Sequence, residues 1–201
     1  MTQRILPRYV ACGLVAVILV SGLAVADDTK TKEVKIKDIL LKVPASWKQE
    51  KPKSRLRLAQ FQIPAAKGGG ENGELAIFSF GASDFSANVR RWISQFDAKG
   101  RKTKITTGEA KLGKYVFVEI SGTYKKSIGP PIERKTKPVP GSRVMAVILV
   151  VPDKGVYYFK MVGQDTTVAV QGTALRVAFG GDASKEKEIK PDKQKRPDKK
   201  E

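Results

Sequence analysis

The side chains that carry most covalent catalysis and metal binding are almost missing from this sequence. Histidine does not occur among its 201 residues, and the single cysteine, Cys12, lies within residues 1–26. Thiolates and imidazoles supply most nucleophilic catalysis, most proton transfer near neutral pH and most transition-metal ligation. If residues 1–26 are removed, neither remains. We therefore expect no metal site, no cofactor and no catalytic residues of these kinds.

Carboxylates and one serine–lysine pair are the remaining candidates for catalysis. A glycosidase needs two carboxylates close together, and nothing in the sequence pairs any two of the acidic residues considered. These residues are Asp84, Glu109, Glu119, Glu133, Asp153 and Asp165. Asp153 is explained as a turn residue and Asp165 as a helix cap. Ser184 and Lys187 have the Ser-x-x-Lys spacing of some acyl enzymes, but they lie in a segment that we expect to be disordered. A hydrolase is the least favoured function.

Clustered lysines and arginines give a stronger signal. The chain has 38 basic and 20 acidic residues, a net charge of +18, most of it in the part expected to fold. Such a field attracts anions. Residues 125–141 contain several prolines and glycines, which predict a long, stiffened loop that is either a binding loop or a solvated connection. The contact residues predicted in this loop are Lys125, Lys126, Arg134, Lys135 and Lys137, and a second predicted patch contains Lys51, Lys53, Arg55 and Arg57.

These clusters favour a non-enzymatic binding or accessory protein over an enzyme. Its expected partner is an acidic protein or an anionic envelope polymer. Nucleic acid is disfavoured, because few aromatic residues lie among the cations to stack on bases. One alternative is an assembly or scaffold protein that docks through a mixed surface. Another is that the excess charge serves solubility alone.

Residues 1–26 have the organisation of a secretory signal peptide. Its parts are the cations Arg4 and Arg8, the apolar run Val10–Leu23, and the small residues Ala24 and Ala26 before Asp27. The apolar run is short for a membrane span, although an uncleaved anchor is the alternative. We expect cleavage before Asp27, a periplasmic or extracellular location, and no transmembrane segment once the leader is removed.

Residues 34–181 are predicted to form one α+β domain, between a short extension at 27–33 and a disordered charged tail at 182–201. The predicted strands are Ile36–Val43, Arg55–Ile63, Leu75–Phe80, Tyr115–Tyr124, Val144–Val151 and Val156–Val162. Val144–Val151 is apolar on both faces, which is typical of a central strand. Pro152–Gly155 has turn residues that should return the chain antiparallel. The glycine-rich segment 67–73 predicts another hairpin connection.

Two helices are expected between the strands. Asn88–Asp97 places Trp92 and Phe96 on an apolar face, with Ser83 or Ser86 as its N-cap. A second helix is expected at Thr166–Phe179, before two glycines. The tail contains no aromatic residue and a single large aliphatic one, so it should bury too little apolar surface to become ordered.

Several short strings resemble the PsbP-like superfamily and, more closely, exported bacterial proteins of unknown function that share its fold. The strings are Val43–Trp47, Leu58–Pro64, Phe78–Gly81, Asn88–Phe96, Gly122–Tyr124 and Tyr158–Gly163. The resemblance implies an antiparallel β-sheet flanked by helices, an α-β-α sandwich. It also implies an accessory or binding role without a shared catalytic motif. A role in a photosystem is not carried over.

Overall fold

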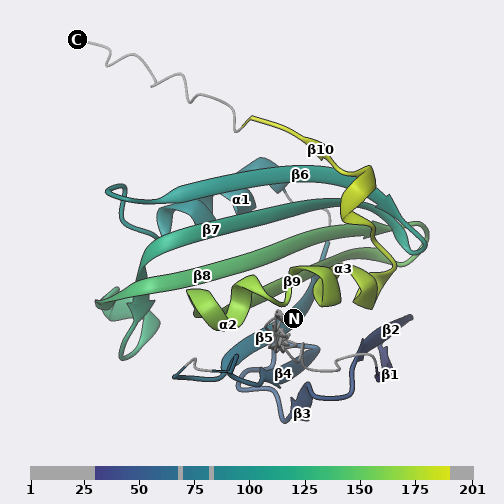
Figure 1. The fold of residues 1–201 in the computed structure, drawn as a ribbon, viewed down its shortest axis with the longest axis horizontal. Helices are drawn as coiled ribbons and strands as arrows, with labels where there is room; N and C mark the ends of the chain where they lie inside the picture. The colour runs from purple at the N-terminus through teal and green to yellow at the C-terminus, as the bar shows by residue number, and fades with distance from the viewer. Residues whose placement is uncertain (1–29, 68–69, 82–83, 191–201) are drawn as a thin grey trace, which may run out of the picture.

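A central antiparallel sheet of eight strands organises the chain (Figure 1). The computed structural model describes residues 30–67, 70–81 and 84–190; the leader, its cleavage site at Ala24, Ala26 and Asp27, and residues 191–201 of the predicted tail lie outside these ranges. The strands of this sheet, in spatial order, are β10 (Lys187–Glu188), β6 (Lys102–Ala110), β7 (Gly113–Ser127), β8 (Thr136–Val151), β9 (Gly155–Gln164), β5 (Gly73–Phe80), β4 (Ala59–Ile63) and β3 (Lys48–Glu50). A separate hairpin pairs β1 (Thr31–Ile36) with β2 (Ile39–Pro44).

The apolar run at Val144–Val151 lies at the centre of the sheet, as predicted. It forms most of β8, between β7 and β9. Alternate side chains enter opposite cores: Met145, Val147 and Leu149 on one face, and Val144, Ala146 and Ile148 on the other. The turn at Pro152–Gly155 is also confirmed, because β9 returns antiparallel and both Asp153 and Gly155 have positive φ.

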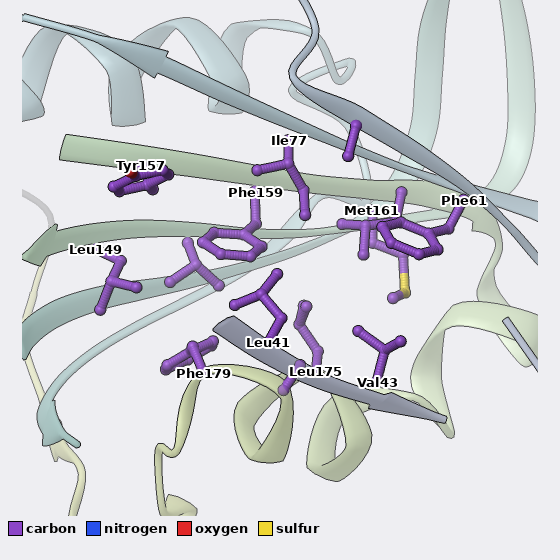
Figure 2. Packing of buried hydrophobic residues seen from close by; sticks show 14 of the residues in the cluster. Leu41, Val43, Phe61, Ile77, Leu149, Tyr157, Phe159, Met161, Leu175 and Phe179 are labelled. Carbon is purple, nitrogen blue, oxygen red and sulfur yellow. The ribbon is translucent and has the colours of Figure 1, made fainter. Parts of the chain in front are cut away.

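Helices cover both faces, so the protein belongs to the α+β class. On one face the core contains α2 (Asp165–Ala169), α3 (Gly172–Phe179) and the β1–β2 hairpin. Figure 2 shows Leu41 and Val43 of this hairpin beside Leu175 and Phe179 of α3, under the side chains of β9. On the other face, α1 (Phe85–Ser94) buries Trp92, and Phe96 follows into the same core.

The helices differ in detail from the prediction. Asp84, rather than Ser86, caps α1: its carboxylate accepts a hydrogen bond from Ala87 N at 3.0 Å. Ser83 lies outside the described residues. The second predicted helix is interrupted at residues 170–171 and forms two helices, α2 and α3. At this break, the side-chain oxygen of Gln171 accepts a hydrogen bond from the Trp47 indole at 3.0 Å. Asp165 is the first residue of α2, and its side chain pairs with Arg143 instead of capping.

The predicted domain start and first strands also need correction. Residues 31–33 of the expected extension belong to β1, since the chain turns at residues 37–38 and forms a hairpin where one strand was expected. The strand predicted from Arg55 begins only at Ala59, which leaves Leu56 66% exposed. Strand β6 was not predicted, because its residues Lys102–Ala110 are mostly polar and only partly buried.

The predicted disordered tail is wrong for residues 182–190. They form a 3₁₀ turn at Ala183–Lys185 and strand β10, which pairs with β6. One carboxylate explains this order. Glu186 accepts two hydrogen bonds from Arg176, at 2.6 and 2.9 Å, and others from Thr106 and Tyr115. The side chains of Glu186 and Arg176 are only 4% and 9% exposed. A paired ion can be buried where an unpaired one cannot.

Glu186→Gln should destabilise the protein by about 3 kcal/mol, because it leaves the buried Arg176 guanidinium without its main counter-charge. The second carboxylate near Arg176, that of Glu119 at 3.4 Å, keeps the loss at the low end of the usual range. Urea unfolding at neutral pH measures the change. Glu188→Gln, an exposed position two residues later on β10, is the matched control and should be neutral. Equal stabilities for the two variants would contradict the assigned role of Glu186.

Candidate functional site

Three of the five cations predicted on a long loop, Lys125, Lys126 and Lys137, lie instead on two paired strands, and the other two lie in the short connection between these strands. Strand β7 continues to Ser127 and β8 begins at Thr136, so only residues 128–135 connect them. Lys126 lies opposite Lys137 in the register of the two strands. The loop was predicted because prolines and glycines usually interrupt strands. Here, Pro138 and Pro140 occupy the outer part of β8, which lacks a β9 partner, and the other two prolines lie in the short connection. We call residues 125–137 the basic ribbon.

The basic ribbon extends past the rest of the sheet, at the left end of β7 and β8 in Figure 1. Strand β6 pairs with β7 only as far as Ser121, and β9 pairs with β8 only from Ser142. All five predicted cations are therefore brought together on one protrusion: Lys125, Lys126, Arg134, Lys135 and Lys137. Of these five cations, only Lys135 has an ion-pair partner among the described residues, Glu133 at 2.9 Å. Ile132, in the connecting 3₁₀ turn, is 89% exposed.

The second predicted patch is partly neutralised by the fold. Arg57 pairs with Glu74 of β5 at 2.7 Å and also donates to Gln60 at 2.6 Å. Lys53 pairs with the other oxygen of the same carboxylate. Burial by itself would raise the pKa of Glu74, but hydrogen bonds from Lys53 and Arg57 hold it below its usual range. The other two members of the patch, Lys51 and Arg55, remain exposed.

The two patches do not form one surface along the sheet. The residues of the second patch lie in the connection between β3 and β4, whereas the basic ribbon extends from β7 and β8. In the strand order, β9 and β5 stand between β8 and β4. Glu74 pairs with two of the four cations of the second patch, whereas only one of the five cations of the basic ribbon has an ion-pair partner among the described residues.

Sequence reasoning missed a pocket of about 300 Å³ between α1 and the sheet. Its wall includes the aromatic rings of Phe78, Phe80 and Tyr158, and Trp92 and Arg91 line it from α1. Lys160 of β9 also lines it, and its ammonium donates to Gln95 Oε1 at 2.6 Å and to the Tyr124 hydroxyl at 3.2 Å. The one signal in the sequence was a lysine at an inward position of an otherwise apolar strand.

The surroundings of Lys160 disfavour its positive charge. Burial and the positive charges of Arg91 and Arg57 lower the pKa of Lys160 from 10.5 to about 8, while Glu74 acts in the opposite direction. No carboxylate among the described residues forms an ion pair with this ammonium; its contacts are the two hydrogen bonds and the Tyr124 ring, 5.3 Å away.

The carboxylates considered for catalysis occupy structural positions. Nothing in the sequence indicates that Glu119 and Asp165 are close together, but both carboxylates form ion pairs with the Arg143 guanidinium, at 3.3 and 2.6 Å. Ser184 Oγ donates to Asp182 at 2.7 Å. Within the described residues, no group of three or more acidic side chains is arranged to hold a metal ion.

No protein-family model and no curated protein matches this chain. In the three described ranges, every helix is too short or too polar to cross a bilayer.

Lys160→Met should change how stability depends on pH. Because the pKa of Lys160 is about 8 when folded and 10.5 when unfolded, the unfolded state binds more protons between these values. The free energy of unfolding of the wild type should therefore rise relative to the variant, by roughly 2–3 kcal/mol from pH 8 to 10.5. Urea unfolding at several pH values measures this. With Lys126→Met, at an exposed lysine, the difference from wild type should stay flat; a flat difference for Lys160→Met would refute the assignment.

Proposed function

We propose that this protein is an exported, non-enzymatic binding module of PsbP-like fold that engages an anionic partner through the basic ribbon. The observation that carries the proposal is the basic ribbon itself, where five cations extend past the sheet and the described residues supply one carboxylate among them. Cations in such a place keep their field in solvent, where it can attract an acidic protein or an anionic envelope polymer.

Two further features support this proposal. Its PsbP-like component is supported by the antiparallel sheet with helices on both faces, and by the agreement of the strings Asn88–Phe96 and Tyr158–Gly163 with α1 and β9. Its export component rests on the signal-peptide organisation of residues 1–26.

Reversing two cations of the basic ribbon, Lys126→Glu with Lys137→Glu, should weaken binding to polyanions. Each cation near an anionic surface contributes about 1 kcal/mol, so a loss of about 30-fold or more is expected at about 0.15 M salt. The two positions face each other in the ribbon. Two carboxylates there repel as two ammonium groups do, which preserves the fold. The probes are polyglutamate for an acidic protein and a phosphate-bearing polymer for an envelope component.

The control is a second double reversal, Lys30→Glu with Lys35→Glu, at exposed lysines near the N-terminal hairpin. It changes the net charge by the same amount and should reduce binding much less. Equal losses for the two double variants would mean that total charge, not the basic ribbon, governs binding. A wild type that binds neither probe at low salt would defeat the proposal.

One observation favours a second function, an assembly protein that docks through a mixed surface. Ile132 is 89% exposed and Ile128 is 45% exposed at the tip of the basic ribbon. Apolar side chains in such a position suit a partner that buries them, and burying one contributes roughly 1.5–3 kcal/mol.

This second function predicts binding to native envelope fractions that survives about 1 M salt, where screening shortens electrostatic attraction to about 3 Å. Ile132→Ser should then abolish the salt-resistant part, because it removes the exposed apolar contact. Val170→Ser, at a 65% exposed position on another element, is the matched control. Retention that disappears completely in high salt would exclude this alternative and leave the anionic partner.

A further inference from the structure

Lys160 stands in an unusual position on the sheet. Its register neighbours on the two adjacent strands are Ala76 of β5 and Ala146 of β8, whose side chains are single methyl groups. Lys160 is on the face covered by α1, where the alternate residues of β9 belong to the core around Trp92. The pocket of about 300 Å³ lies on this face.

The pocket combines an apolar wall with a positive end. The Phe78 and Phe80 rings stack at 5.9 Å, and the Phe80 and Tyr158 rings are also 5.9 Å apart, which forms a continuous aromatic surface. At the positive end, the Lys160 ammonium has three N–H groups and two hydrogen-bond acceptors, Gln95 and Tyr124. Arg91, exposed on α1, adds a second cation to the lining.

Among the described residues, the charged groups around the pocket leave the Lys160 ammonium without a carboxylate of its own. Glu74 is the carboxylate whose field reaches Lys160, but it already forms ion pairs with Lys53 and Arg57. A partly buried ammonium without its own counter-ion is costly, and an anion placed beside it is correspondingly favourable. Ligand pockets of about 300–1,000 Å³ typically combine apolar walls with a few polar groups, and this pocket is at the small end of that range.

We infer that this pocket binds a small carboxylic acid with an aromatic or short alkyl body. The ligand carboxylate takes the third N–H of Lys160 and pairs with its charge, and Arg91 adds attraction at the mouth. The apolar body lies against Phe78, Phe80 and Tyr158. This site is separate from the basic ribbon and does not depend on the anionic partner proposed above.

Two acids, 3-phenylpropanoate and hexanoate, are suitable probes, and calorimetric titration into the full chain measures their binding. At neutral pH at least one should bind in the millimolar range or tighter. The neutral amide 3-phenylpropanamide has the same shape as its acid and should bind about 10-fold or more weakly, since it lacks the charge. Binding of the acid should weaken as pH rises past about 8, where Lys160 loses its proton. The titratable groups that face it are Arg91, Arg57, Glu74, Tyr124 and Tyr158.

Lys160→Met tests the residue directly. The variant should lose most of the preference for the acid over the amide, because it keeps the apolar wall and Arg91 but loses the charge of Lys160. Lys126→Met on the basic ribbon loses the same charge elsewhere and should keep the full preference for the acid. Three results would overturn the inference: no binding of either acid to the wild type, equal binding of acid and amide by the wild type, or an unchanged preference in Lys160→Met. None of these results bears on the basic ribbon.

Discussion

On each face of the central sheet, the fold buries one positively charged side chain, and the rest of the structure depends on how that charge is compensated. Arg176 lies against one face, where Glu186 and Glu119 supply carboxylates and the Phe117 ring lies 3.6 Å from its guanidinium carbon. Its pairing with Glu186 fastens residues 182–190 to β6, β7 and α3, and so extends the domain past Gly181. Lys160 lies against the other face, where no carboxylate of the described residues forms an ion pair with it. The first cation stabilises the architecture, whereas the second leaves a charge for something else to satisfy.

The parts of the fold that sequence predicted are those where local pattern and tertiary environment agree. Val144–Val151 is apolar at every position, and a strand with both faces buried is the arrangement that explains this. Trp92 and Phe96 recur at helical spacing and are buried, as their pattern indicates. The predicted tail failed because a single distant contact decides its structure. Nothing near Glu186 in the sequence shows that it meets Arg176, and without that contact residues 182–190 have the composition of a disordered tail.

The candidate site shows the same division. Both basic clusters were visible in the sequence, but the sequence could not show which of their cations would form ion pairs. Glu74 lies 17 residues after Arg57 in the sequence, and the pairing of β4 with β5 brings its carboxylate to Lys53 and Arg57. The basic ribbon keeps its charge because the strands beside β7 and β8 end before reaching it. The pocket was not predictable, since most of its lining comes from β5, α1 and β9, which are distant in the sequence and meet only in the fold.

The basic ribbon and the pocket are separate sites, but both are connected to Gln95 and Tyr124. Gln95 accepts a hydrogen bond from the Lys160 ammonium through its side chain and one from Lys125 N, at 2.7 Å, through its backbone. Tyr124, the second acceptor of Lys160, immediately precedes the basic ribbon. Yet salt acts on the two sites differently. Exposed cations more than about 8 Å from their partners are largely screened at physiological ionic strength, whereas a charge enclosed by protein is screened much less. An anion held by the ribbon should therefore respond steeply to salt, and an acid held by Lys160 should respond weakly, even though both sites use lysine.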